Sequence, residues 1–221
     1  MFDKIRVAIL DDHQSIIDGY LYRLVKASEI EVVATGSYGE DLEPMLASHP
    51  VDVLLLDVMI PTAANNDNPY PLLYLVPKLL QRYPDLTILI ISMHAQRVLI
   101  KGVVESGVSG YILKDDQAII RELAAVVRSV AQGGICFSRS VHDLLLKDQD
   151  ADPVLTARQA EVLSLLAAYP NLTTAEAALQ LQVANSTVRN ILSGAYLRLE
   201  VHNRTAAIVK ARQQGLLTPL A

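Results

Sequence analysis

Five short apolar runs, separated by segments with helical spacing, occupy the first 115 residues of the chain. The segment after the first run places Ile17, Leu21 and Leu24 on one face of a helix. Strands that alternate with helices form a parallel sheet covered on both faces. We therefore predict an α/β fold, a flavodoxin-like doubly wound (βα)5 domain whose ligands bind at the carboxyl ends of the strands. The runs are IRVAIL (5–10), EVVATG (31–36), VDVLLLD (51–57), LTILIIS (86–92) and GYIL (110–113).

The pattern changes after residue 134. The last helix of the first domain, which begins near residue 117, ends at Gly133-Gly134, a typical C-terminal signal of helices. Residues 135–153 are predicted to be a linker, partly helical, because their end is acidic and closes on a proline. From residue 154 short helices follow one another with short turns. The sequence thus predicts a first domain over 1–134 and a second, smaller all-α helix-turn-helix domain over 154–221.

The net charge of -5 is unevenly distributed. Residues 1–150 contain 13 Lys and Arg against 20 Asp and Glu, whereas residues 151–221 contain 6 against 4. A basic surface attracts phosphates, but so small an excess indicates nucleic-acid binding only in combination with a motif.

The cellular compartment is predicted from three absences in the sequence. The single cysteine, Cys136, excludes an internal disulfide and fits a reducing environment. No stretch approaches the roughly 20 apolar residues that a membrane span needs, and the first residues do not resemble a secretory signal. We therefore expect a cytoplasmic protein without a membrane partner.

Charged and hydroxyl side chains follow the predicted strands: Asp11 and Asp12 the first, Asp57 the third, Ser92 the fourth and Lys114 the fifth. The carboxyl ends of these strands meet in one crevice, where three carboxylates repel one another unless cations neutralise them. Mg²⁺ prefers oxygen ligands, and the Lys114 ammonium adds a further positive charge. A screened Asp57 carboxylate can attack a phosphoryl group and form an aspartyl-phosphate, whose oxygens would bind Ser92 and Lys114.

Four blocks, ILDDH, LLLDVMIP, IISMHA and SGYILKDD, resemble the signature blocks of response-regulator receiver domains. The tail, LTARQAEVLSLL followed by TVRNILSGAYLRLEVHNRTAAI, is similar to the LuxR-type helix-turn-helix of the NarL/FixJ class of two-component response regulators. The resemblance implies a sensor histidine kinase and promoter DNA as partners, a homodimer when phosphorylated, and control of transcription. The implied roles are phosphoacceptor (Asp57), Mg²⁺ ligands (Asp11, Asp12, Asp57 and the backbone carbonyl of Met59) and switch (Ser92, Tyr111 and Lys114).

The same resemblance implies the residues that meet DNA. The recognition helix is expected from about residue 185 to 199, in the major groove. Gly194 interrupts it at a cost of roughly 1 kcal/mol relative to Ala. Few cations lie on this surface, which implies modest affinity and a shallow salt dependence. Base edges are assigned to Arg189, Asn190 and Ser193, and phosphates to Thr187, Arg198 and Arg204.

Two segments depart from the pattern of the family. The stretch PTAANNDNPYPLL, which begins at Pro61, has no glycine and is several residues longer than its counterpart. Its Asn, Asp and Pro content predicts a surface turn rather than a helix. The stretch AAYPNLTT (167–174) is likewise longer than the usual turn between the first two helices of the tail.

Two other functions stay open at this point. A phosphatase of the haloacid-dehalogenase type also uses a strand-end Asp and Mg²⁺, but it needs a second Asp where this chain has Met59. We therefore expect no enzymatic activity beyond Mg²⁺-dependent self-phosphorylation of Asp57 from a phosphodonor and slow autodephosphorylation. The second alternative is a phosphorylated interaction protein whose tail binds DNA weakly or without specificity.

An assembly surface is also predicted from the apolar stripes of two helices. Ile120, Leu123 and Val127 lie on one face of the helix near residues 117–132, and Ile208 lies on the last helix. Because a symmetric dimer needs self-complementary surfaces, such stripes are candidate interfaces.

Overall fold

The computed structural model describes residues 4–146 and 154–219. A six-stranded sheet, with every neighbouring pair parallel, has the order β2-β1-β3-β6-β7-β8. This order and the helices around it confirm the predicted doubly wound fold. The strands are β1 (Ile5–Leu10), β2 (Ile30–Gly36), β3 (Val53–Leu56), β6 (Thr87–Ser92), β7 (Gly110–Leu113) and β8 (Cys136–Phe137).

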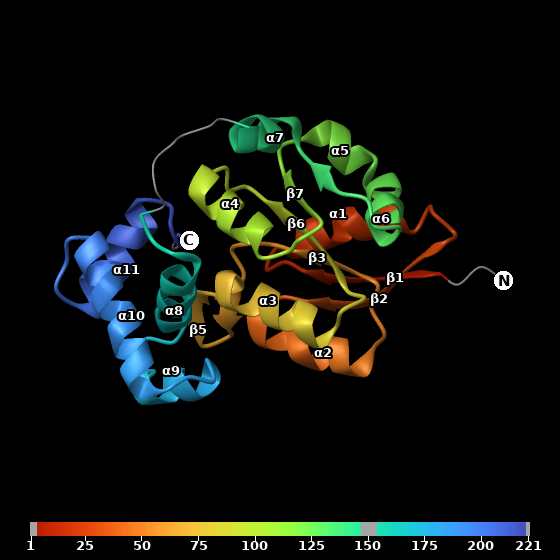
Figure 1. The fold of residues 1–221 in the computed structure, drawn as a ribbon. Coiled ribbons are helices and arrows are strands. Elements are labelled where there is room, and N and C mark those ends of the chain that lie inside the picture. Colours follow the sequence, from red (N-terminus) through yellow and green to blue (C-terminus); the bar gives the residue numbers. More distant parts are fainter. Residues whose placement is uncertain (1–3, 147–153, 220–221) are drawn as a thin grey trace.

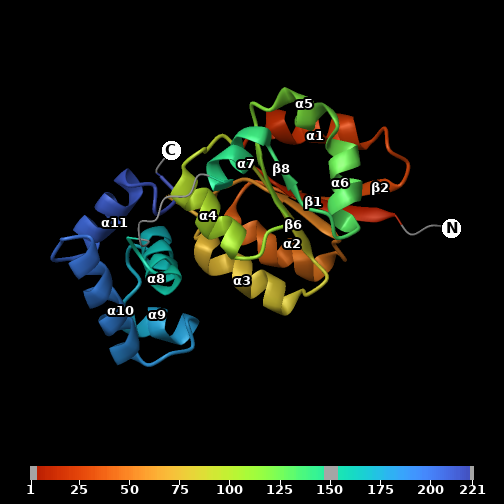
Figure 2. The same ribbon diagram turned by 45° about the horizontal axis from the view of Figure 1, so that its top comes forward.

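Helices cover both faces of the sheet (Figures 1 and 2). Alternation along β1 sends Val7 and Ile9 into one apolar cluster and Ala8 and Leu10 into the other, as expected for a strand buried on both sides. Side chains of α1, α5 and α6 complete the first cluster, and those of α2, α3 and α4 complete the second. The bounds are α1 (Gln14–Leu24), η1 (Gly39–Asp41), α2 (Leu42–Ser48), α3 (Leu72–Arg82), α4 (Arg97–Glu105), α5 (Gln117–Arg121) and α6 (Leu123–Ala131).

The helix predicted near residue 117 is divided into α5 and α6 at Glu122. It ends where the glycines predicted: Gly133 has a φ of 85°, and the Gly134 N–H donates to the Ser129 carbonyl. Ile120, Leu123 and Val127, predicted as an assembly surface, are buried in the core of the monomer instead. For these three residues the prediction is wrong because the stripe packs against the sheet, whereas Ile208 is half-buried against the apolar cluster of the second domain.

The first part of the segment predicted as a linker packs against the first domain. Strand β8 pairs with β7, and α7 (Arg139–Leu146) lies against α4, where Arg97 Nε donates to the Leu144 carbonyl at 2.8 Å. The buried Ser138 bridges these elements, because its Oγ accepts from the Leu113 N–H at 2.9 Å. The acidic end predicted for this linker, residues 147–153, lies outside the described residues.

The long stretch after Pro61 forms an antiparallel hairpin of β4 (Pro61–Ala63) and β5 (Asn66–Pro69) where the sequence predicted a surface turn. Tyr70, just after β5, is buried against Gly39, where a Cβ would lie 2.2 Å from the tyrosine ring. A glycine is therefore required for this close approach, and the hairpin is tied to the body of the domain.

Over residues 154–219 the second domain has four helices, and side chains cap the starts of three of them. Thr156 and Thr173 form capping boxes with Gln159 and Glu176, and the Asn203 side chain accepts from the Ala206 N–H. Helix α10 runs through Gly194 without a break, and a Cβ there would lie 2.9 Å from Nε2 of the buried Gln159. The glycine thus lets α10 pack closely on α8. The helices are α8 (Ala157–Ala168), α9 (Thr174–Gln180), α10 (Asn185–Arg198) and α11 (Arg204–Gln213).

The two domains are in contact in the structure. Helix α8 lies beside α3 and β5, whereas α10 and α11 lie on the side away from the sheet (Figure 1). None of the helices over residues 4–146 and 154–219 combines the length and the apolar character of a membrane span.

Candidate functional site: an acidic phosphorylation pocket

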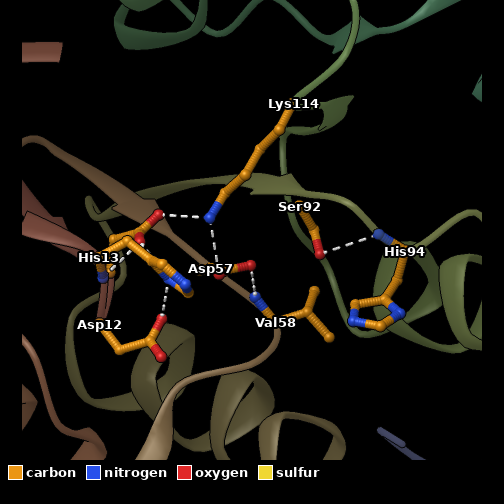
Figure 3. A network of polar contacts seen from close by, with 8 residues as sticks. Asp12, His13, Asp57, Val58, Ser92, His94 and Lys114 are labelled. Carbon is orange, nitrogen blue, oxygen red and sulfur yellow. Dashed lines mark hydrogen bonds and ion pairs between the residues drawn. The ribbon is translucent and has the colours of Figure 1, made fainter. Parts of the chain in front are cut away.

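The ammonium group of Lys114 lies between two carboxylates at the carboxyl end of the sheet (Figure 3). Its Nζ is 2.6 Å from Asp11 Oδ2 and 2.8 Å from Asp57 Oδ2. Each side chain follows a strand, and the parallel pairing of β1 with β3 and of β6 with β7 brings these strand ends to one edge. The structure therefore brings Asp11, Asp57 and Lys114 together as predicted from their positions.

All three of these side chains are nearly removed from solvent. The exposed fraction is 2% for Asp11, 4% for Asp57 and 9% for the side chain of Lys114. Burial raises the pKa of the Asp11 carboxyl above its ordinary value, although Lys114 opposes the rise. Burial alone would lower the pKa of Lys114, but the Asp57 and Asp11 carboxylates outweigh it and hold that pKa above its usual value. The lysine is thus charged at neutral pH.

Asp12 and His13 extend the acidic group toward solvent. The Asp11 carboxylate accepts from the His13 N–H at 3.0 Å, and His13 Nδ1 lies 2.7 Å from Asp12 Oδ1. Ligand atoms of these three residues lie within 4.8 Å of one another. His13 itself directly precedes α1.

The donor set fits a divalent hard cation. The buried carboxylates of Asp11 and Asp57 share the single ammonium of Lys114, and the exposed Asp12 adds a third carboxylate at the edge of the pocket. A buried excess of negative charge is costly unless a cation neutralises it, and carboxylate oxygens are the ligands that Mg²⁺ prefers. The charge and oxygen chemistry of these residues therefore fits Mg²⁺.

Hydrogen bonds hold the backbone N–H and both carboxylate oxygens of Asp57. Its backbone N–H donates to the Leu10 carbonyl at 2.9 Å, which ties it to the end of β1. Its Oδ1 accepts from the Val58 N–H at 2.6 Å, and its Oδ2 accepts from Lys114. Donors of this kind also stabilise the negative oxygens of a phosphoryl group. The arrangement suits a carboxylate that accepts a phosphoryl group.

Ser92 and Tyr111 lie next to this pocket, and both are fully buried. The Tyr111 hydroxyl donates to the His94 carbonyl at 2.7 Å, and the His94 N–H donates to Ser92 Oγ at 3.3 Å. Burial raises the pKa of Tyr111 well above its ordinary value, so the phenol keeps its proton. The Tyr111 side chain is therefore held in the interior and is connected to Ser92 through the backbone of His94.

Sequence reasoning did not find His94 and Ser138, two residues that join the switch side chains to their surroundings. Both act through hydrogen bonds that involve backbone groups: His94 bonds to Tyr111 and Ser92, and Ser138 to the backbone of β7. His94 lies within the block IISMHA, two residues after Ser92, and this position was its one signal. Ser138 had none, since its partner is 25 residues away.

The residues assigned to DNA fall into two groups. Thr187, Arg189, Asn190, Ser193 and Arg198 are all exposed on α10. Arg204, at the start of α11, is half-buried, and its Nη1 donates to the carbonyls of Pro170 and Leu172 at 3.2 and 2.8 Å. Part of the Arg204 guanidinium therefore holds the loop between α8 and α9.

Comparison with known families agrees with this architecture. Residues 7–127 match the response regulator receiver domain, and residues 153–211 match the bacterial regulatory proteins of the luxR family. The chain therefore belongs to the response regulators, in the NarL/FixJ class that joins a receiver to a LuxR-type helix-turn-helix domain.

Relatives share this organisation over nearly their whole length. The transcriptional regulatory protein DegU of Brevibacillus brevis is 30% identical over 96% of this chain and 95% of its own. The probable transcriptional regulatory protein NarL of Mycobacterium tuberculosis is 28% identical over 97% of both chains. In fold, the chain resembles RcsB of Salmonella enterica serovar Typhimurium bound to promoter rprA, with a TM-score of 0.64 and 23% identity over 94% of this chain and 98% of that one.

Proposed function

We propose that this chain is a phosphorylation-controlled transcriptional regulator that accepts a phosphoryl group on Asp57 from a sensor histidine kinase and binds promoter DNA as a homodimer. The observation that carries the first half is the Lys114 ammonium between two buried carboxylates, 2.6 Å from Asp11 and 2.8 Å from Asp57, next to the buried Ser92. A location in the cytoplasm stays a prediction.

In the proposed transfer, a carboxylate oxygen of Asp57 attacks the phosphorus of a phosphohistidine on the kinase. The new P–O bond forms as the P–N bond breaks, and the imidazole leaves with the bonding electron pair and takes up a proton. Mg²⁺ bound by Asp11, Asp12, Asp57 and the backbone carbonyl of Met59 would supply neutralisation of the phosphoryl charge. In the slow hydrolysis that ends the phosphorylated state, water attacks the phosphorus, the bond between phosphorus and the Asp57 oxygen breaks, and inorganic phosphate leaves as the carboxylate is regenerated.

The residues around Asp57 respond to the new group. We infer that the Lys114 ammonium and the Val58 N–H, which bind the carboxylate now, bind phosphoryl oxygens afterwards, and that Ser92 donates its hydroxyl to a third oxygen. A shift of Ser92 would displace the backbone of His94 and so change the position of Tyr111, because both side chains bond to that backbone. Ser92, Tyr111 and Lys114 are the proposed switch.

The proposed output is sequence-specific DNA binding by α10. Arg189 and Asn190 are exposed side chains that can read guanine and adenine in the major groove. The DNA-binding transcriptional activator DevR/DosR of Mycobacterium tuberculosis, which carries DNA binding in its name, is 30% identical over 95% of this chain. This similarity favours the regulator over an interaction protein.

Phosphorylation and DNA selection test the two halves. With Mg²⁺ and acetyl phosphate, intact-mass spectrometry should detect one acid-labile phosphoryl group on the wild type and none on Asp57→Asn, whereas Asp85→Asn, an exposed Asp elsewhere on the receiver, should be labelled normally. Equal labelling of Asp57→Asn would contradict the assignment.

The labelled protein should then enrich a defined sequence from random DNA. If it enriches none, the interaction protein replaces the regulator.

A further inference from the structure

The two segments that depart from the family pattern meet in space. Asn66, in the hairpin β4–β5, donates from Nδ2 to the carbonyl of Ala168 at 2.9 Å, although the two residues are 102 positions apart. Ala168 is the last residue of α8, at the start of the long stretch AAYPNLTT. Two insertions in different domains thus contact each other directly.

A second contact lies on α3. Tyr74 is buried in the apolar cluster of the second domain rather than in that of the receiver. Its hydroxyl donates to the carbonyl of Gln180 at 3.2 Å, and Lys78 Nζ donates to the same carbonyl at 2.6 Å. Gln180 is the last residue of α9, so α3 satisfies a carbonyl that the helix end leaves open.

The hairpin is a firm support for this contact. The Tyr70 N–H donates to the Ile60 carbonyl at 2.8 Å and closes the hairpin at its base, and the Thr62 hydroxyl donates to the Asn68 carbonyl at 2.7 Å. The ring of Tyr70 lies against Gly39, where no larger residue fits. The hairpin, including Asn66, is therefore fixed to the body of the receiver.

The contacting surface and the DNA-reading surface face different ways. In Figures 1 and 2, α8 lies between the receiver and α10, so that α10 lies on the outer side. Arg189, Asn190 and Ser193 remain exposed while the domains touch. The contact thus does not cover the residues assigned to base edges.

We propose that the hairpin β4–β5 and α3 form an interdomain latch, made of Asn66–Ala168 and of Tyr74 and Lys78 with Gln180, which holds the second domain in one orientation with α10 outward. This inference rests on the proposed DNA binding. A latched domain is already ordered before it meets DNA, which lowers the entropy cost of placing two recognition helices at the separation that a two-part site requires. The latch therefore supports DNA binding and does not inhibit it.

A matched pair of double variants tests the latch. Asn66→Asp with Lys78→Met removes the side-chain donor to Ala168 and one of the two side-chain donors to Gln180, and leaves the Tyr74 hydroxyl in place. The aspartate introduced at position 66 keeps an oxygen that can accept from Asn68. The control, Asn65→Asp with Lys101→Met, changes the net charge equally at exposed positions on the same hairpin and on α4.

The first measurement reports the orientation of the domains without DNA. In a Cys136→Ala background, spin labels at Ala125→Cys on α6 and Gln213→Cys on α11, both exposed, give a distance distribution between the two domains. We expect one narrow distribution for the wild type and for the control, and a clearly broader one for the latch variant. A wild-type distribution as broad as that of the latch variant would overturn the proposal.

The second measurement uses the full chain, phosphorylated with acetyl phosphate, and the DNA selected by the wild type. The latch variant should bind about tenfold more weakly than the control, as expected from the loss of two hydrogen bonds that hold the domain. Equal binding, or tighter binding, would overturn the proposal, and tighter binding would identify the contact as inhibitory. Failure of the wild type to select any DNA would remove the proposed function, and the distance measurement alone would then decide whether the latch exists.

If the double variant does not fold, Tyr74→Phe replaces it. This substitution keeps the ring in the apolar cluster and removes only the hydroxyl that donates to Gln180. The distance distribution should again broaden relative to the wild type, and an unchanged distribution would count against the latch.

Discussion

The Lys114 ammonium lies 2.8 Å from the Asp57 carboxylate, with side-chain exposures of 9% and 4%. A buried ion pair contributes little net stability, but removal of one partner leaves an uncompensated charge in a site of low dielectric. In this pocket the loss of Lys114 would leave Asp57 and Asp11 facing each other.

We expect Lys114→Met to lower the free energy of unfolding by about 3 kcal/mol without Mg²⁺, the typical cost of breaking a buried pair. Millimolar Mg²⁺ should restore more stability to this variant than it adds to the wild type, because a cation then neutralises the same carboxylates. Urea unfolding with and without Mg²⁺ measures both effects. Lys101→Met, on the exposed face of α4, is the control. Equal gains from Mg²⁺ in both variants would show that Lys114 does not compensate the carboxylates.

A second ion pair predicts a pH dependence. The Arg6 guanidinium and backbone N–H hold the pKa of Asp52 below its ordinary value of 3.8, although partial burial opposes this. The group is therefore charged in the folded state at pH values where the unfolded chain is already protonated. Its contribution to stability is fully present above 3.8 and is lost as the pH falls through the lowered folded pKa.

Asp52→Asn should accordingly be less stable than the wild type at neutral pH, and the difference should shrink as the pH falls below 3.8. Because the pair is partly exposed, the difference should also decrease in high salt. Denaturant unfolding from about pH 7 to about pH 3 measures it. If the difference in the free energy of unfolding stays constant over this range, Arg6 does not lower the pKa of Asp52 in the folded state.

The pocket was predictable because topology alone brings strand ends together. Asp11, Asp57 and Lys114 each follow an apolar run, and in a parallel sheet those runs all end at one edge. The contacts of Tyr70 and Ser138 were not predictable, since each depends on where a distant backbone passes. Strand β8 was missed for a related reason: two residues carry no periodicity, and pairing with β7 creates the strand.

The hairpin shows the same limit. Its Asn, Asp and Pro content predicted a turn, and two short strands formed because residues 61–69 pair with each other. We expect Gly39→Ala to destabilise the receiver by about 1–3 kcal/mol, because the new Cβ would lie 2.2 Å from the Tyr70 ring.

A double-mutant cycle separates this clash from other effects at position 39. In a Tyr70→Ala background the ring is absent, so Gly39→Ala should cost much less than in the wild type. Thermal or urea unfolding of the four proteins gives the coupling energy. If the cost at Gly39 is the same in both backgrounds, the close approach of Tyr70 is not the reason for the glycine.

Substitution of Arg189 should affect sequence-specific DNA binding, whereas substitution of Arg204 should affect the stability of the second domain. Arg189 is exposed on α10, so Arg189→Ala should leave the free energy of unfolding within about 0.5 kcal/mol of the wild type. If it reads a base, the same change should weaken binding to the selected site by about 1–3 kcal/mol and barely alter non-specific binding.

Arg204→Ala, in contrast, should lower the stability of the domain, because Arg204 Nη1 already donates to the carbonyls of Pro170 and Leu172. Arg204→Ala should lower the free energy of unfolding by about 1–2 kcal/mol as these acceptors lose a charged donor. It should also weaken binding to all sequences alike, and if the guanidinium contacts a phosphate as well, the salt slope should fall by about one. Titrations at several salt concentrations, alongside urea unfolding, distinguish the two contributions. If Arg204→Ala lowers the free energy of unfolding but leaves the salt slope unchanged, Arg204 has the structural role alone. If the free energy of unfolding is unchanged, the contacts of Arg204 with the loop do not stabilise the domain.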